Sequence, residues 1–215
     1  MKTAGNNPET EAFDNHVQAY DRWFDEHPVL FESEIRALDR AAPHSEYALE
    51  VGAGTGRFAR ECGIDWGIEP SPKMAKVAEQ RGTNTLIAKA ENIPFLDNTF
   101  GYVLMVTVDC FLENPEQAYR EIRRVLKPGG ILVNGMIDRN SELGRRYEKR
   151  KNQSLFYRHA EFRSPDKITK ILEQVGFEEF QYWQTLITAS EEEPEEPIPG
   201  YGRGGFVVIK ATARK

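Results

Sequence analysis

Three glycines at alternate positions have the type and the spacing to hold a small molecule. Gly52, Gly54 and Gly56 follow four residues of strand character at 48–51, and a helix-compatible stretch begins at Arg57. Glycine adopts positive φ readily and has no Cβ to keep a ligand away from the backbone. The first amides of the following helix are unpaired and carry the positive end of its dipole. The turn therefore predicts a pocket for a polar, partly anionic small molecule.

The spacing of these glycines separates two classes of ligand. A dinucleotide site requires G-x-G-x-x-G, in which the third glycine lets helix and strand approach closely. Counted from Gly52, that third glycine falls at position 57, which holds Arg57. The sequence therefore does not match the dinucleotide-binding motif. A turn with a purely structural role is the alternative that the glycines alone leave open.

A carboxylate further along the chain fits the same ligand. Glu69 ends a short predicted strand at 65–69 and lies seventeen positions after Gly52, close to the roughly 20 expected for an acidic residue that reaches a ribose. A carboxylate accepts hydrogen bonds from both vicinal hydroxyls of a ribose at once. The alternative is a surface acid at the end of a strand. Ser71 and Pro72 then predict the start of a helix, as its N-cap and first helical residue.

Residues 102–106 form an unbroken apolar run, which predicts a central strand buried on both faces. In open α/β sheets the ligand lies beyond the carboxyl ends of the strands. Thr107 and Asp109 follow this run and are therefore expected beside the reacting group. Asp109 could orient a substrate, act as a base or cap the next turn, and the sequence leaves these roles open.

Four segments, in their order along the chain, resemble the motifs of the class I S-adenosylmethionine-dependent methyltransferases, in particular the type 11, UbiE-like enzymes that act on small molecules. They are EVGAGTGRFA at 50–59, GIEPS at 67–71, KAENIPF at 89–95 and REIRRVLKPGGILV at 120–133. The resemblance spans about residues 45–212. It implies an α/β, Rossmann-like fold, with a seven-stranded, mostly parallel sheet, helices on both faces and a C-terminal antiparallel β-hairpin.

The same resemblance implies S-adenosylmethionine as the cofactor. In the family the glycine turn lies against the methionine part, the acidic residue of the second motif binds the ribose, and the loop at 89–95 closes on the adenine ring. The cofactor-binding residues that this carries over to the present sequence are Glu50, Gly52, Ala53, Gly54, Gly56, Glu69, Pro70, Ala90, Glu91, Ile93 and Thr107.

Two residues depart from the family pattern around the adenine loop. Lys89 and Gly101 stand where the family commonly has aspartates. Lys89 cannot accept a hydrogen bond from the adenine amino group. The adenine contacts are therefore expected to rest on the backbone of Ala90 and Glu91 and on the apolar side chain of Ile93.

Aromatic residues are concentrated at 13–31, where Phe13 and Tyr20 fall on one helical face. In the family this region often lies across the cofactor pocket. The predicted organisation is an N-terminal helical lid at 1–44 and a single globular methyltransferase domain at 45–215. An aromatic stripe that only packs on the core is the alternative.

The sulfonium of S-adenosylmethionine is already an activated methyl donor, so the protein mainly has to align the nucleophile with it and exclude water. A base is needed only for a nucleophile that must lose a proton. The candidates for a catalytic role are Asp109, His27 and Tyr20. The segment 107–111 lacks the N/D-P-P-Y/F motif of enzymes that methylate nucleic-acid bases and some protein amides, which argues against those substrates.

The composition limits the remaining possibilities. The 215 residues suffice for one domain of ordinary size, and the net charge of −6 argues against a nucleic-acid partner. No apolar run is long enough to cross a bilayer, and residues 1–13 resemble neither a secretion signal nor an anchor. Two cysteines predict neither a disulfide framework nor a zinc site. We therefore expect a cytoplasmic protein with no bound metal and no membrane partner.

The predicted function is direct, in-line methyl transfer to an unidentified small molecule. A basic segment at 138–151, with Arg139, Arg145, Arg146 and Lys149, could receive an anionic acceptor or could form a solvated, salt-bridged helix. One alternative is a non-catalytic S-adenosylmethionine-binding regulatory or assembly protein. Another is a protein-methylating enzyme, which would need an open groove over the cofactor. The sequence specifies neither the acceptor nor the oligomeric state.

Overall fold

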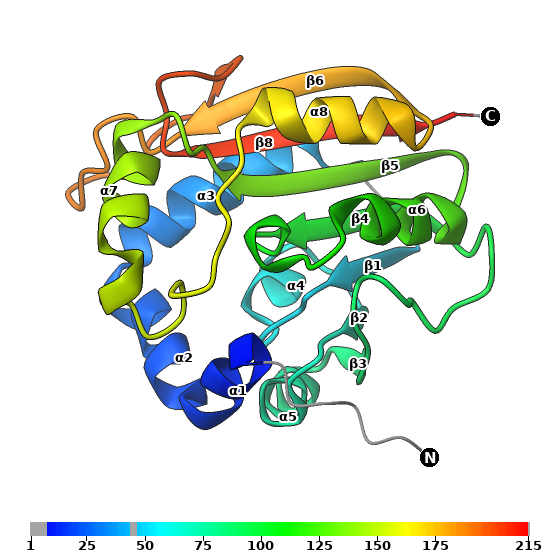
Figure 1. Cartoon of the computed structure of the whole chain (residues 1–215), viewed down its shortest axis with the longest axis horizontal. Helices are drawn as coiled ribbons and strands as arrows, with labels where there is room; N and C mark the ends of the chain where they lie inside the picture. The colour runs from blue at the N-terminus through cyan, green and yellow to red at the C-terminus, as the bar shows by residue number, and fades with distance from the viewer. Residues whose placement is uncertain (1–7, 44–46, 215) are drawn as a thin grey trace.

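The computed structural model describes residues 8–43 and 47–214 (Figure 1). Residues 1–7 and 44–46 lie outside this part, and so does the predicted boundary between the lid and the main domain. An eight-stranded sheet in the order β3-β2-β1-β4-β5-β8-β6-β7 forms the centre. Its strands are β1 (Ala48–Val51), β2 (Trp66–Ile68), β3 (Asn84–Leu86), β4 (Phe100–Val106), β5 (Leu126–Ile137), β6 (Phe177–Thr185), β7 (Ile198–Pro199) and β8 (Phe206–Ala213).

The sheet is parallel from β3 through β5 and antiparallel beyond β5. Strand β8 lies antiparallel between β5 and β6, which confirms the predicted C-terminal antiparallel pair. The predicted count of seven strands is wrong by one. The additional strand is β7, whose two residues pair with Trp183 and Gln184 of β6. The end of the acidic segment 191–199 thereby satisfies its backbone against the open edge of the sheet.

Two layers of helices cover the sheet. Helices α6 and α8 pack on one face, and α3 and α4 pack on the other (Figure 1). All residues of β4 are buried; Val103 and Met105 lie in the core under α6 and α8, while Tyr102 and Leu104 lie in the core under α3 and α4. This alternation explains the unbroken apolar run in the sequence.

The helices that the structure contains are α1 (Pro8–Asn15), α2 (Val17–Glu26), α3 (Pro28–Ala41), α4 (Arg57–Glu61), α5 (Pro72–Gln80), α6 (Pro115–Val125), α7 (Glu142–Arg150) and α8 (Pro165–Gln174), with short 3-10 helices η1 (Asp109–Phe111) and η2 (Lys151–Gln153). The Oγ atom of Ser71 accepts a hydrogen bond from the amide of Met74 at 3.3 Å, so Ser71 caps α5 as predicted. Within the described part of the chain, no helix is long and apolar enough to span a bilayer.

The aromatic N-terminal region forms three helices, which break at His16 and before Pro28. Helix α3 buries Ala37, Leu38 and Ala41 and is one of the helices that cover the sheet. Helices α1 and α2 lie on the side to which the arrowheads of β1 and β4 point (Figure 1). The carboxyl ends of the parallel strands therefore face α1 and α2.

Candidate functional site

A cavity of about 290 Å³ lies at the carboxyl ends of the parallel strands, where open α/β sheets bind their ligands. On one side it is bounded by residues that follow β1, β2, β3 and β4. This cavity floor consists of Gly52, Gly54, Glu69, Pro70, Ala90, Glu91, Thr107 and Val108. On the other side lie side chains from α1, α2, α7 and the segment after η2. This aromatic roof consists of Phe13, Tyr20, Trp23, Phe24, Tyr147, Phe156 and Tyr157.

The glycine turn forms a bare corner of the cavity floor. Gly52 has a φ of +73°, and a Cβ added there would lie 2.3 Å from Cγ2 of Val108. Gly54 has a φ of +56°, and a Cβ there would lie 3.2 Å from the hydroxyl of Tyr20. The amide of Gly52 donates to the carbonyl of Ile68 at 2.9 Å, which ties the turn to the end of β2. The corner is thus closed to side chains but exposes its backbone to the cavity.

Glu69 is fixed in this corner by two backbone amides. Its Oε2 accepts a hydrogen bond from the amide of Gly54 at 3.0 Å, and its Oε1 accepts one from the amide of Ser71 at 2.9 Å. The side chain is buried, and this burial raises the pKa of Glu69 to about 7 against the opposing effect of the two amides. Each carboxylate oxygen has room for a second donor. Glu69 is therefore oriented to receive two neighbouring hydroxyl groups.

A charged cluster ties helix α2 to the glycine turn. Asp21 accepts hydrogen bonds from Oγ1 of Thr55 at 2.7 Å, from Nε of Arg57 at 3.0 Å and from Nη2 of Arg81 at 2.6 Å. Burial raises the pKa of Asp21, but these hydrogen bonds outweigh it and hold the pKa well below its usual range. Arg57, which stands where a dinucleotide site has its third glycine, thus anchors the helix that carries part of the aromatic roof. This cluster could not be predicted from the sequence, because its members lie far apart along the chain.

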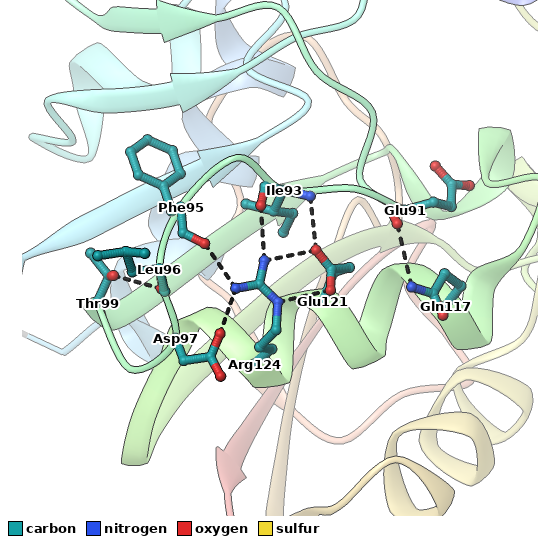
Figure 2. A network of polar contacts seen from close by, with 9 residues as sticks. All are labelled: Glu91, Ile93, Phe95, Leu96, Asp97, Thr99, Gln117, Glu121 and Arg124. Atoms are coloured by element: carbon teal, nitrogen blue, oxygen red, sulfur yellow. Dashed lines mark hydrogen bonds and ion pairs between the residues drawn. The ribbon is translucent and has the colours of Figure 1, made fainter.

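A second arginine holds the loop that follows β3, as Figure 2 shows. The guanidinium of Arg124 donates to the carbonyls of Ile93 and Phe95 at 2.8 Å each, and it also pairs with Asp97 and Glu121. Glu121 in turn accepts from the amide of Ile93 at 3.0 Å. Helix α6 therefore clamps the loop predicted to close on adenine, and the side chain of Ile93 points into the core rather than into the cavity.

Lys89, which departs from the family pattern, and the nearby Glu91 both form polar contacts with the segment that leads into α6. Nζ of Lys89 forms an ion pair with Oε1 of Glu113 at 2.8 Å, and both residues line the cavity. The carboxylate of Glu91 accepts from the amides of Glu113 and Asn114, at 3.1 Å and 3.3 Å. The charge of Lys89 is thereby paired at the cavity wall. The carboxylate of Glu91 is hydrogen-bonded to the backbone that leads into α6.

The structure brings most of the predicted cofactor-binding residues together. Those that line the cavity are Gly52, Gly54, Glu69, Pro70, Ala90, Glu91 and Thr107, and those that do not are Glu50, Ala53, Gly56 and Ile93. Glu50 is buried beside α4, where the amide of Ala59 donates to it, and burial raises its pKa well above the usual range. A Cβ at Gly56 would lie 3.0 Å from the Cα of Ala78, so this glycine allows α5 to approach.

Of the three candidates for a catalytic role, the structure places only Tyr20 in the cavity wall. Burial raises the pKa of Tyr20 well above its usual range, so its hydroxyl keeps its proton and can donate a hydrogen bond. Nδ1 of His27 lies 2.9 Å from Oε1 of Glu191, away from the cavity. The structure therefore favours Tyr20 as a hydrogen-bond donor rather than a base.

Asp109 lies in the short helix η1 and does not line the cavity. Burial raises its pKa to about 7, while the charge of Arg163 and hydrogen bonds from its own amide and that of Cys110 oppose this. Asp109 is the first residue of η1, whose N-cap is Val108, and no side-chain hydrogen bond among the described residues caps this helix. Its place away from the cavity therefore supports neither contact with the reacting group nor a capping role.

Thr107 marks the point where β4 enters the cavity. Its φ of +53° is unusual for a β-branched residue. Its amide donates to the carbonyl of Gly135 at 2.7 Å, which helps to hold this conformation. The bend directs the chain so that Val108 packs against the glycine turn. Strained backbone of this kind is concentrated at ligand sites.

Comparisons with known proteins agree with this geometry. The "Methyltransferase domain" family model matches residues 49–134. An uncharacterized protein of Methanocaldococcus jannaschii is 44% identical over 200 residues, which are 93% of this chain and 97% of that protein. A crystal structure from Thermotoga maritima, described as a SAM-dependent methyltransferase and possible histamine N-methyltransferase, has 43% identity and a TM-score of 0.92, and it covers 95% of this chain and 99% of that one. A Haemonchus contortus phosphoethanolamine N-methyltransferase, solved with S-adenosylhomocysteine, shares the fold at 16% identity and a TM-score of 0.67, over 94% of this chain and 58% of that one.

Proposed function

Because the chain belongs to the class I S-adenosylmethionine-dependent methyltransferases, we propose that it transfers the methyl group of this cofactor directly to a small molecule bound under the aromatic roof. The cofactor, when bound, supplies a methyl group on a positively charged sulfur. An acceptor atom attacks the methyl carbon with its lone pair while the carbon–sulfur bond breaks.

The cavity floor fits the cofactor. Gly52 and Gly54 line the cavity with their backbone, where an amino-acid tail would lie, and Val108 and Tyr20 leave no room for a side chain at either position. The buried carboxylate of Glu69 offers acceptor positions to the two hydroxyls of a ribose. We assign the adenine contacts to the backbone of Ala90 and the following residue, at the edge of the same cavity.

The single observation that carries the small-molecule proposal is the position of the aromatic roof. The hydroxyl of Tyr20 lies over Gly54, within 3.2 Å of where a Cβ would be, and the neighbouring Asp21 fastens α2 to the turn. A protein substrate would need an open groove at this place. A roof of this kind also excludes water and limits the orientations of a bound acceptor, which are the main requirements for in-line transfer.

The Thermotoga maritima relative suggests where a search for the acceptor should begin. Its description names histamine N-methylation, and it aligns over nearly the whole of both chains. Small amines are therefore the first compounds to test, followed by alcohols and thiols of similar size.

The test is turnover of S-adenosylmethionine against this panel, measured as S-adenosylhomocysteine formed. We expect activity with at least one compound, its loss in Glu69→Ala, and full activity in Glu79→Ala, an exposed carboxylate on α5. Binding of S-adenosylhomocysteine in calorimetry without turnover of any compound would contradict the proposal and support a regulatory or assembly protein instead.

A further inference from the structure

Glu34 is a buried carboxylate in the wall of the cavity, separate from the cavity floor. It lies on α3, its exposed fraction is 7%, and it lines the cavity. Within residues 8–43 and 47–214, no hydrogen bond or ion pair reaches its carboxylate, and burial alone raises its pKa to about 8. A buried carboxylate without a partner costs free energy. A side chain of this kind in a cavity wall points to a ligand that satisfies it.

Three tyrosines of the aromatic roof line the cavity together with Glu34. Tyr20 comes from α2, Tyr147 from α7 and Tyr157 from the segment after η2, and all three line the same cavity. Burial raises the pKa of each hydroxyl, and the negative charge of Glu34 adds to the increase in all three. The rings of Tyr147 and Tyr157 lie 5.1 Å apart in an edge-to-face arrangement. Aromatic faces carry partial negative charge, so the surroundings of Glu34 favour a cation.

Most of the charged side chains around the cavity are acidic. Among the described residues, the charged side chains that line it are Glu26, Glu34, Glu69, Glu91, Glu113 and Lys89. The only basic one in this set, Lys89, forms an ion pair with Glu113. Glu69 is assigned to the ribose, and Glu91 accepts from backbone amides. Glu26 is exposed, so Glu34 is the buried acidic residue left to face the acceptor.

We propose that Glu34, with the rings of Tyr20, Tyr147 and Tyr157, binds a small amine acceptor in its protonated, positively charged form. The bound amine gives up a proton to the Glu34 carboxylate or to solvent before its nitrogen lone pair attacks the methyl carbon. This inference rests on the proposed function and adds the acceptor's charge to it. The carboxylate contributes a charge-assisted hydrogen bond or ion pair, and the rings contribute cation–π attraction. Desolvation strengthens both contributions.

An anionic acceptor does not fit the same cavity. It would meet the like charge of Glu34, and the basic residues of the segment 138–151 are absent from the cavity wall. Arg146, for example, is exposed and pairs with Glu142 one turn earlier on α7, at 3.3 Å. This arrangement favours the solvated-helix interpretation of that segment.

The test uses two probes of similar shape, 2-phenylethylamine and the neutral 2-phenylethanol. Each is titrated at pH 7.5 into the complex of the protein with S-adenosylhomocysteine. We expect the amine to bind at least about tenfold more tightly than the alcohol. In Glu34→Gln this preference should disappear while the affinity for S-adenosylhomocysteine stays within about twofold. Glu34→Asp, which restores the charge, should regain part of the preference.

Glu26→Gln is the matched control, because Glu26 lines the same cavity but is exposed; its amine preference should be unchanged. Equal binding of both probes, no binding of either, or an unchanged preference in Glu34→Gln would overturn the proposal. Tighter binding of the alcohol would also overturn it and would show Glu34 acting as a neutral donor. If S-adenosylhomocysteine itself does not bind, it is the proposed function that fails.

Discussion

The cavity floor and the aromatic roof face the same space but are built by different means. The floor presents a glycine turn, backbone amides and the carboxylate of Glu69, placed at the ends of strands that pair in parallel. The roof consists of aromatic side chains on short helices and is fastened to the floor by the hydrogen bonds of Asp21. One surface is defined by backbone geometry and the other by side-chain packing.

The cavity floor and the aromatic roof therefore tolerate substitution to different degrees. A position such as Gly52 admits no side chain, because both its φ and the contact with Val108 forbid one. Roof positions such as Phe156 have side chains that could be exchanged for others of similar volume at a modest cost. Changes in the floor should therefore reduce cofactor affinity, whereas changes in the roof should affect stability and acceptor choice.

The largest effect is expected for Gly52→Ala. The added Cβ would lie 2.3 Å from Cγ2 of Val108, and a residue other than glycine at a φ of +73° is strained by about 1–2 kcal/mol. Relief requires the turn or Val108 to move, and either movement alters the corner that receives the amino-acid tail. We expect the affinity for S-adenosylhomocysteine, measured by calorimetry, to fall at least about 100-fold.

Gly63→Ala is the matched control for this variant. Gly63 has a similar φ of +67°, but a Cβ there meets nothing within 4 Å. It should lose about 1 kcal/mol of unfolding free energy from backbone strain and keep its cofactor affinity. Unchanged affinity in Gly52→Ala would show that the corner is not where the cofactor lies.

The next largest effect concerns the pH dependence of cofactor binding. Burial raises the pKa of Glu69 to about 7 in the free protein, and ribose hydroxyls that donate to it favour the carboxylate form. A proton must therefore leave on binding below pH 7, so the affinity should be constant well above pH 7 and fall by up to about tenfold per pH unit below it. Calorimetry with S-adenosylhomocysteine between pH 5.5 and 8.5 measures this.

Two variants sharpen this experiment. Glu69→Gln should bind about tenfold or more weakly at pH 8 and should show no pH dependence near 7. Glu34→Gln should keep the pH dependence, although the pKa of Glu34 is also raised, to about 8, in the same cavity. A flat profile for the unaltered protein would count against Glu69 as the ribose ligand.

We expect substitution of Asp21, which links the aromatic roof to the glycine turn, to change cofactor affinity less than the variants above. It should clearly lower the stability of the fold. Asp21→Asn removes the acceptor charge for Arg57 and Arg81, which are about four-fifths buried. We expect a loss of about 1–3 kcal/mol of unfolding free energy and faster amide exchange in α2. Asp25 is the other, exposed ion-pair partner of Arg57. Asp25→Asn should therefore reduce the free energy of unfolding by less than about 1 kcal/mol. Equal losses in both variants would show that α2 is not held mainly by Asp21.

The sequence predicts the floor better than the roof, and the reason is physical. A glycine turn after a strand and a carboxylate at the end of the next strand depend on local backbone rules, so their places could be read directly. Glu50 and Ile93 were predicted to bind the cofactor but do not line the cavity, and the local structure explains both. Glu50 alternates with Leu49 and Val51 along β1 and so points away from the core that these two residues share. Ile93 is an apolar residue that helix α6 covers.

The roof depends on tertiary packing that the sequence does not specify. Tyr147 belongs to α7, far from α2 in the chain, and only the folded structure brings it to the same cavity as Tyr20. Glu34 did have a signal. It stands three residues after Phe31 and four before Leu38, so it lies on the apolar face of its helix. A charged residue at such a position indicates a buried group that needs an explanation.

The smallest effect is expected for Arg124→Lys, which tests how far the floor depends on residues outside the cavity. One ammonium cannot reach the carbonyls of both Ile93 and Phe95, as the guanidinium does at 2.8 Å. We expect a loss of about 1 kcal/mol of unfolding free energy, seen as a drop of about 2–4 °C in Tm, and a two- to fivefold weaker affinity for S-adenosylhomocysteine as the loop loosens. Arg120→Lys on the same helix changes only an exposed pair with Glu116 and should alter neither quantity. If Arg124→Lys lowers Tm while the affinity stays the same, the adenine ring does not rest on this loop, and the cofactor contacts assigned to it must lie elsewhere on the floor.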